Sequence, residues 1–371
     1  MPMLHPTTRA ACCTTSRRAD SARPRRAGTT LLASLAVALV AACGAPTAAD
    51  GSATSEPATG VVHVASDIPI DPISPAPVPD LPVTVRSVDG VDVTIDDASR
   101  ILAVDLYGTL GETVFSLGLG ANVVGRDTST GFPEAAALPL VTVGGHSLSA
   151  EAVLDLDPTV VLTDTTIGPP EVLAQLREAG IPVVFFDPTR TLDGIGDQIE
   201  AVATALGVPA AGRALAERTT ADIDAATAAA TGTLSTDGDE APRVAFLYLR
   251  GSAVALLGGP GSGADELVAA IGAADAGTAV GLERPFTQIT SEALVGAAPD
   301  VLLLLEGGLA SVDGVDGLLA VPGIAQTPAG ENRAVVAATD TNLLTFGPRT
   351  GATLRALADA VHEAGTQETG S

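Results

Sequence analysis

The stretch LSAEAVLDLDPTVVLTD, residues 148–164, recurs in related form as ITSEALVGAAPDVLLLL at residues 289–305. Both copies begin with a helical pattern, reach a proline (Pro158 or Pro299) and continue into an apolar run of the length of a buried strand. Helices join the parallel strands of a sheet, so a helix–strand unit in each half of the chain predicts two similar α/β halves.

A glutamate occupies the same place in both copies. Glu151 and Glu292 each lie seven residues before the proline, in the first turn of the expected helix. The helix dipole favours an acidic side chain there, and Ser149 or Ser291 could cap the helix, so a structural role would explain each acid. Recurrence at one offset in both halves is also consistent with a second, shared role.

Outward from this unit, the chain keeps alternating between strand-like and helical runs, which indicates parallel α/β sheets. Residues 191–232 contain helical patterns alone. We therefore expect an N-terminal lobe at 83–190, a connecting helical segment at 191–232 and a C-terminal lobe at 233–371, with a ligand cleft between the lobes. The strand-like runs include RILAVDL (100–106), TVVLTD (159–164), IPVVFFD (181–187), RVAFLYLR (243–250) and DVLLLLEG (300–307).

The first 42 residues have the character of a signal peptide. An arginine-rich stretch precedes TTLLASLAVALVAAC at 29–43, whose apolar part is too short to span a bilayer. Its end, VAAC, resembles the bacterial lipobox, in which the cysteine becomes the lipidated N-terminus after cleavage. Cys12 and Cys13 fall in the part that would be removed, so Cys43 would be the single cysteine left and no internal disulfide could form.

Residues 43–82 are rich in Ala, Pro, Ser, Thr and Asp, and we expect them to form a flexible tether. The formal net charge of the chain is −25, and all 19 basic residues are arginines. So negative a field argues against a nucleic-acid partner and favours a monomeric extracytoplasmic protein.

No motif predicts an enzyme. The glycine-rich GGPGSGADE at 258–266 precedes a helical run, but it lacks the lysine of a phosphate-binding loop, and the chain contains no lysine at all. GHSLS at 145–149 does not match a nucleophile elbow. We therefore expect a binding protein.

These features together resemble the substrate-binding proteins of ATP-driven importers, in the group that serves iron siderophores, haem and cobalamin. The resemblance covers about residues 85–370. It implies two Rossmann-like lobes joined by one rigid long helix, and an ABC permease dimer with its ATPase as partners. It also implies that Glu151 and Glu292 dock against arginine pockets on the two permease subunits. The motifs that carry it are ILAVDL (101–106), GTLGETVFSLGLGANVVGRDTST (108–130), HSLSAEAVLDLDPTVVLTD (146–164) and the glutamate-containing repeat.

Three shorter motifs are GRDTST (125–130), GGHSLSAE (144–151) and YLRG (248–251). They look most like motifs of the haem-binding lipoproteins of actinobacteria. This closer resemblance implies haem b as the transported ligand and a lipid-anchored location on the extracytoplasmic face of a Gram-positive cell membrane, with surface haem receptors as candidate donors. It also implies that His146 and Tyr248 ligate the haem iron from opposite lobes, and that Arg250 hydrogen-bonds Tyr248.

The residue types agree with iron ligation without identifying the ligands. Haem iron is held by His, Cys, Met or Tyr. Both methionines lie in the signal peptide and the remaining cysteine is the expected lipid site. His146 is a lone loop histidine, and by itself it would more often be an ordinary surface residue. The other candidates are His63 in the tether, His362 near the end of the last helix, Tyr107 and Tyr248.

Tyr248 and Arg250 are two residues apart in a strand, so their side chains should point to the same side. A phenol has a pKa near 10 and must lose its proton to bind Fe(III), and a neighbouring guanidinium favours the phenolate. We expect Tyr107, after the first strand, to contact the ligand. Three further residues could contact a porphyrin or its propionates, although a structural role would explain each of them: Phe286, Phe346 and Arg349.

Other interpretations stay open from the sequence alone. A ferric siderophore or cobalamin would keep the importer and change the ligand, although His146 and Tyr248 would then have no defined task. A zinc or manganese carrier would need more histidines and carboxylates converging on one ion. A haem chaperone without a permease would leave the glutamate pair unexplained.

Overall fold

The computed structural model describes residues 60–234, 241–251 and 253–366. The expected signal peptide, Cys43 and the first part of the expected tether lie outside these residues. Within them, no helix has both the length and the hydropathy to cross a membrane.

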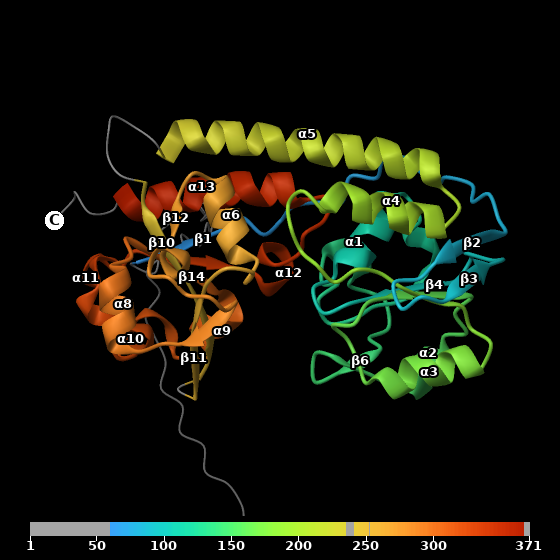
Figure 1. Cartoon of the computed structure of the whole chain (residues 1–371), viewed down its shortest axis with the longest axis horizontal. Coiled ribbons are helices and arrows are strands. Elements are labelled where there is room, and N and C mark those ends of the chain that lie inside the picture. Colours follow the sequence, from blue (N-terminus) through green and yellow to red (C-terminus); the bar gives the residue numbers. More distant parts are fainter. Residues whose placement is uncertain (1–59, 235–240, 252, 367–371) are drawn as a thin grey trace, which may run out of the picture. The chain divides into compact units, whose positions relative to one another are not determined.

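The first lobe is built on a four-stranded parallel sheet in the order β5-β4-β8-β9. Alternate residues of each strand enter two different cores: Ile101 of β4 packs with α1 and α4, and Leu102 packs with α2 and α3. Helices therefore cover both faces (Figure 1). The strands are β4 (Ile101–Val104), β5 (Val123–Gly125), β8 (Val160–Thr163) and β9 (Val183–Phe185), and the helices are α1 (Thr109–Ser116), α2 (Ala150–Asp155), α3 (Pro170–Glu178) and α4 (Ile195–Ala205).

Two antiparallel hairpins are added to this lobe. One pairs β2 (Val83–Arg86) with β3 (Asp92–Ile95) and the other pairs β6 (Thr142–Val143) with β7 (Ser147–Leu148). The short strands β6 and β7 carry too few residues for a recognisable alternation, and this part was expected to be a loop.

The second lobe contains a seven-stranded mixed sheet in the order β1-β15-β14-β10-β11-β13, with β12 also paired to β10. β1, β15, β14 and β10 run parallel, whereas β11 pairs antiparallel with β10 and β13 pairs antiparallel with β11. The strands are β1 (Val61–His63), β10 (Arg243–Arg250), β11 (Val254–Gly258), β12 (Ala274–Asp275), β13 (Phe286–Gln288), β14 (Val301–Leu305) and β15 (Val335–Ala338). The helices are α6 (Ala264–Ala270), α7 (Ala276–Ala279), α8 (Ser291–Ala297), α9 (Glu306–Ala310), α10 (Gly314–Leu319), α11 (Pro328–Asn332), α12 (Asp340–Leu343) and α13 (Thr350–Thr366). Short 3-10 turns lie at Gly120–Asn122, Pro133–Ala135 and Ile324–Gln326.

One long helix joins the two lobes. Helix α5 (Pro209–Leu234) has 26 residues and packs on α4 of the first lobe and on α13 and α6 of the second (Figure 1). Its buried side chains are mostly small or aliphatic and belong to a core that continues from one lobe into the other. The expected architecture of two α/β lobes joined by a long helix is confirmed.

The segment before the first lobe differs from the expected tether. Val61–His63 form β1, which pairs in parallel with β15 at the edge of the second sheet. The chain then passes along the first lobe, where the N–H of Ile73 donates to the Ser116 carbonyl at 2.8 Å and that of Asp80 to Gly207 at 2.8 Å. Residues 60–82 thus form a strap that contacts both lobes. A flexible tether is therefore the wrong description of this part of residues 43–82, because its backbone groups are satisfied by the folded lobes.

A buried ion pair fastens the lobes beneath α5. Arg349 precedes α13 and Glu112 lies in α1, and these residues are 8% and 1% exposed. The guanidinium donates to Glu112 Oε2 from Nε at 2.9 Å and from Nη2 at 2.7 Å, while the Arg349 backbone N–H donates to Oε1 at 2.8 Å. Arg349 Nη1 donates to the Ile68 carbonyl of the strap at 2.8 Å. We call this the Glu112–Arg349 clamp.

Candidate functional site

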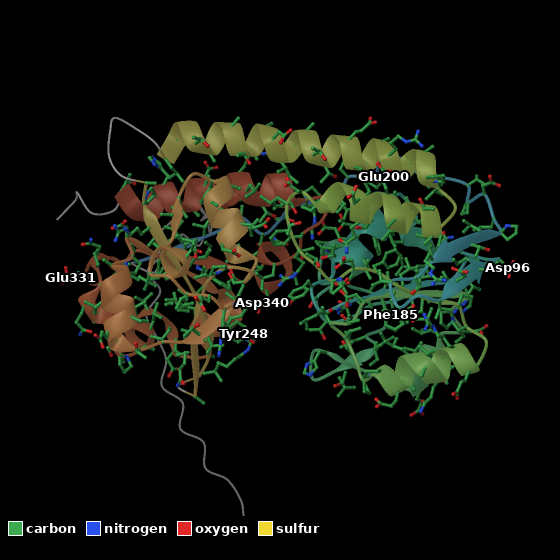
Figure 2. The ribbon with its side chains drawn as sticks, in the orientation of Figure 1. Asp96, Phe185, Glu200, Tyr248, Glu331 and Asp340 are labelled. Atoms are coloured by element: carbon green, nitrogen blue, oxygen red, sulfur yellow. The ribbon has the colours of Figure 1, made fainter. Side chains whose placement is uncertain are left out.

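A cleft of about 730 Å³ is lined by residues of both lobes. This volume lies in the range of small-molecule and cofactor sites, about 300–1,000 Å³. In Figure 2, Tyr248 and Asp340 mark the second-lobe side of the cleft. The ionisable side chains in its lining are Tyr107, His146, Arg190, Tyr248, Arg250 and Asp340, and four hydroxyl side chains also line it: Thr128, Ser129, Ser262 and Thr341.

Tyr248 and Arg250 project together from the end of β10, as the strand alternation predicts. Arg250 Nε donates a hydrogen bond to the Tyr248 hydroxyl at 3.1 Å. The Tyr248 ring packs against Phe286 of β13, with ring centroids 5.9 Å apart. Asp340 Oδ1 lies 3.9 Å from Arg250 Nη2, an acidic neighbour that the sequence did not indicate.

His146 is exposed in the turn of the β6–β7 hairpin, following Gly144 and Gly145, which both have positive φ. The sequence predicts a loop position for His146, and in the structure this loop is the turn of a short β-hairpin. The His146 carbonyl accepts from the N–H of Gly168 at 3.1 Å, which ties the turn to the loop before α3. His146 and Tyr248 therefore line one cleft from opposite lobes.

Tyr107 lies in the cleft wall, as expected, beneath a cation that sequence reasoning missed. The Arg190 Cζ atom lies 3.5 Å from the centroid of the Tyr107 ring. The Tyr107 carbonyl accepts from Thr345 Oγ1 of the second lobe at 2.7 Å. Arg190 lies in the loop between β9 and α4, where no periodic pattern or motif drew attention to it.

Three buried aspartates follow the carboxyl ends of neighbouring first-lobe strands: Asp105 after β4, Asp127 after β5 and Asp164 after β8. Asp127 accepts from the Asp105 backbone N–H at 2.9 Å, and Asp105 accepts backbone N–H groups at the start of α1. Burial, together with the charges of Asp127 and Asp164, raises the pKa of Asp105 to about 7. Burial raises the pKa of Asp127 to about 6 and also raises that of Asp164.

Some predicted residues lie outside the cleft lining. Phe346 is 1% exposed, and Arg349 is held by Glu112, so neither is placed to contact a ligand there. His362 is exposed on α13, and His63 at the end of β1 pairs with Glu306 at 3.0 Å. Of the three residues considered for porphyrin contact, Phe286 alone lines the cleft.

Glu151 and Glu292 are exposed in the first turns of the short helices α2 and α8. Ser149 caps α2 by accepting from the Ala152 N–H at 3.2 Å, as expected. Helix α8 is capped by Thr290 and not by Ser291, because the chain enters the helix one residue earlier. Neither glutamate lines the cleft.

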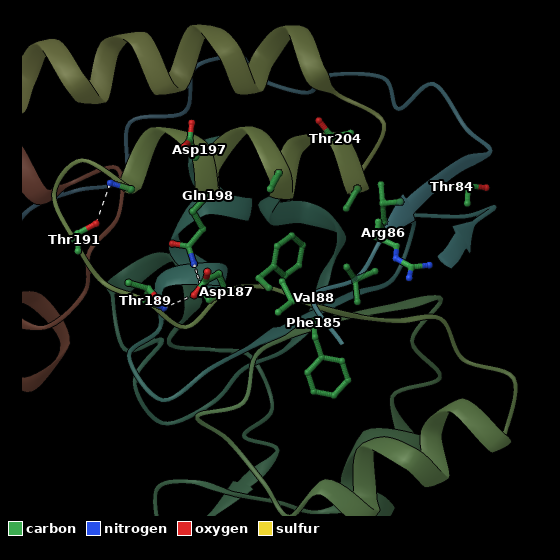
Figure 3. Close-up of a pocket in the computed structure, with 16 residues that line it drawn as sticks. Thr84, Arg86, Val88, Phe185, Asp187, Thr189, Thr191, Asp197, Gln198 and Thr204 are labelled. Atoms are coloured by element: carbon green, nitrogen blue, oxygen red, sulfur yellow. Dashed lines mark hydrogen bonds between the residues drawn. The ribbon is translucent and has the colours of Figure 1, made fainter. Parts of the chain in front are cut away.

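A second cavity of about 670 Å³ lies within the first lobe, between the β2–β3 hairpin, β9 and α4 (Figure 3). Phe185, Gln198 and Thr204 line it, with Arg86 at the hairpin. None of the residues predicted from the sequence to bind or dock lies there. The cleft between the lobes is therefore the candidate ligand site.

Comparison with known proteins identifies a matching family model and similar solved structures. A family model described as periplasmic binding protein matches residues 104–341. Among solved structures, the chain is similar to the heme binding protein HmuT, with 38% identity, 81% of this chain and 97% of that one covered, and a TM-score of 0.76. It is also similar to the apo form of the periplasmic heme-binding protein RhuT from Roseiflexus sp. RS-1, with 41% identity, 72% and 100% covered, and a TM-score of 0.65.

One curated relative is named for a different ligand, cobalamin. The cobalamin-binding protein of Halobacterium salinarum is 28% identical over 224 residues, which are 60% of this chain and 58% of that protein. The chain thus spans little more than half the length of this relative. Because the family model covers well over half of the chain and HmuT is matched over nearly its whole length, the chain belongs to the periplasmic binding protein family.

Proposed function

We propose that this protein binds haem b in the cleft between its lobes and delivers it to the permease dimer of an ABC importer for iron acquisition. The observation that carries the proposal is the hydrogen bond from Arg250 to Tyr248 on one wall of the cleft, with His146 lining the same cleft from the other lobe. Members of the periplasmic binding protein family bind substrates for transport and are not enzymes, which agrees with the expectation of a binding protein.

The haem-binding relatives support this ligand. HmuT and RhuT are heme-binding proteins, and HmuT has been solved as three single-alanine variants, which replace a histidine, a tyrosine and the arginine two positions after that tyrosine. Tyr248 and Arg250 have the same spacing.

The cleft residues supply the chemistry that ferric haem requires. The Tyr248 phenol must lose a proton to bind Fe(III). The Arg250 guanidinium, with Nε 3.1 Å from the phenol oxygen, would stabilise the phenolate as a neighbouring cation and hydrogen-bond donor. His146 would offer an imidazole from the opposite lobe, so that the iron bridges the two lobes.

Cobalamin is the second candidate ligand, because several curated relatives are named cobalamin-binding or vitamin B12-binding proteins. A ferric siderophore is a third possibility of the same transport class. Titrating the purified protein separately with hemin, cyanocobalamin and a ferric siderophore, followed by absorbance, decides among them. We expect saturable binding of hemin alone, weakened by His146→Ala and unchanged by His362→Ala, a matched histidine outside the cleft. Saturable binding of cobalamin without hemin binding would reject the haem assignment.

Two further features would place the protein at the importer. Relatives such as the heme-binding protein HutB of Vibrio cholerae are periplasmic, and lipidation at Cys43 would retain this protein at the outer face of the cell membrane. Glu151 and Glu292, exposed and outside the cleft, would dock the two permease subunits, one from each lobe.

A further inference from the structure

Arg190 lies where the two lobes meet at the cleft. Its loop leaves the first lobe after β9 and contacts the second: the N–H of Leu192 donates to Glu266 Oε2 at 2.7 Å, and Arg190 Nη1 donates to the Leu344 carbonyl at a long 3.4 Å. Its guanidinium stacks on Tyr107, so one face of the cation is covered by an aromatic ring, and the residue lines the cleft. The side chain is thereby held in place without an anion.

The carboxylates around Arg190 are occupied by other donors. Asp105 and Asp164 accept hydrogen bonds from their own loops, and Asp265 accepts from the backbone N–H groups of Gly261 and Gly263. Among the described residues, Arg190 forms no ion pair within 4.0 Å. A guanidinium has five N–H donors, and most of those of Arg190 have no protein acceptor.

The charges in the cleft indicate what the N–H donors of Arg190 bind. Arg190 and Arg250 are the two arginines in its lining, and Arg250 already donates to Tyr248 and faces Asp340 at 3.9 Å. The chain as a whole carries a net charge of −25 and would repel an anionic ligand. A partly buried, unpaired cation inside such a field favours a bound anion, and a carboxylate fits a guanidinium edge with two parallel hydrogen bonds.

We propose that Arg190 binds a carboxylate of the ligand and makes the cleft selective for a carboxylate-bearing macrocycle. For haem, which the proposed function supplies as the ligand, Arg190 fixes one propionate while the iron is held at Tyr248. Cobalamin carries amides around its macrocycle in place of carboxylates, so the same residue discriminates against it.

The test compares ligands with and without free carboxylates. Hemin and hemin dimethyl ester are titrated into wild type, Arg190→Gln, Arg190→Lys and Arg213→Gln, a control that makes the same charge change on the exposed face of α5. Arg190→Gln should weaken hemin binding about 10-fold to 100-fold, the size of a hydrogen-bonded charge pair, and leave ester binding unchanged. Arg190→Lys should lose less, and Arg213→Gln should resemble wild type.

Iron-free protoporphyrin IX separates this inference from the haem assignment. Its binding, followed by fluorescence, should depend on Arg190 and be insensitive to Tyr248→Phe, because it has carboxylates but no iron. Equal loss of hemin and ester binding in Arg190→Gln, or no loss of either, would overturn the carboxylate role even if haem binding stands. If that variant does not fold, equal affinity of wild type for hemin and its ester overturns it. If the wild type binds protoporphyrin in a way that depends on Arg190, and binds hemin no more tightly than protoporphyrin, the carboxylate role stands and the assignment of iron ligands is removed.

Discussion

Replacing Glu112 by alanine should destabilise the protein more than any exposed charge change. Glu112 is 1% exposed, and its carboxylate accepts three hydrogen bonds from Arg349, at 2.7, 2.8 and 2.9 Å. Arg349 is 8% exposed, lies 5.2 Å from the centroid of the Phe132 ring and also donates to Ile68. Loss of the carboxylate leaves a buried guanidinium with no countercharge and an unpaired backbone N–H.

The expected cost follows from this burial. Removing one partner of a buried ion pair typically lowers the free energy of unfolding by about 3–5 kcal/mol. Replacing both Glu112 and Arg349 by apolar residues of similar size, in Glu112→Leu/Arg349→Met, should cost less than Glu112→Ala because no charge is stranded. The chain contains no tryptophan, so urea unfolding is followed by circular dichroism at pH 7.

An exposed pair provides the matched control. Arg218 of α5 donates to Asp71 of the strap at 3.0 Å, but the Asp71 side chain is 84% exposed. Asp71→Asn should therefore cost less than about 1 kcal/mol. If the free energies of unfolding of Glu112→Ala and Asp71→Asn differ by less than about 1 kcal/mol, the Glu112–Arg349 clamp does not hold the lobes as we describe.

Three other predictions concern acid, docking and anchoring. Burial raises the pKa of Asp105 to about 7 from 3.8, so the folded protein binds more protons than the unfolded chain between these values. The free energy of unfolding should therefore fall as pH rises from about 4 to about 7. In Asp164→Asn, the free energy of unfolding should depend less on pH, as measured by urea unfolding in high salt. An unchanged pH dependence would contradict the electrostatic coupling of Asp164 to Asp105. Replacing both Glu151 and Glu292 by alanine should leave hemin affinity unchanged and lower haem uptake by cells that contain the permease; normal uptake rejects the docking role. Cys43→Ala should release the protein from membranes or leave it unprocessed, and an intact mass without an acyl group in the wild type would exclude lipidation.

Much of the fold could be predicted because its central strands are continuous apolar runs. VLLLL in β14 and ILAV in β4 are buried on both faces, as parallel strands covered by helices must be. Helix α2 follows its expected cap Ser149, and α3 begins at Pro170. The repeat at 148–164 and 289–305 accordingly corresponds to α2–β8 in one lobe and α8–β14 in the other.

The missed elements are short or depend on distant partners. Strand β1 has three residues within a Pro- and Ser-rich stretch, and its partner β15 lies near the other end of the chain. Strand β13 has three residues and no continuous apolar run, whereas β11 is a short apolar run, VALLG, that pairs antiparallel with β10. Their place in the sheet is set by tertiary pairing, which local pattern does not report.

The site residues that could be predicted belong to residue types that are rare in this chain, and those that were missed belong to a common type. The chain has two tyrosines, so Tyr107 and Tyr248 stood out, and both line the cleft. Arginines are more numerous, and Arg349 was considered as a ligand contact while Arg190 was not. The difference between a buried structural cation and a cation in a cleft depends on which loops meet, and the sequence alone does not contain that signal.

The absorption spectrum of the hemin complex of Tyr248→Phe tests the central claim most directly. Phenylalanine keeps the ring that packs on Phe286 and removes only the hydroxyl that Arg250 contacts. We predict that the variant loses the tyrosinate-to-iron charge-transfer band, shifts its Soret band and binds hemin at least about 10-fold more weakly, a larger loss than in His146→Ala, where water can replace the imidazole. A Tyr248→Phe complex with the spectrum and affinity of the wild type would contradict tyrosinate ligation and remove the main support for haem as the ligand.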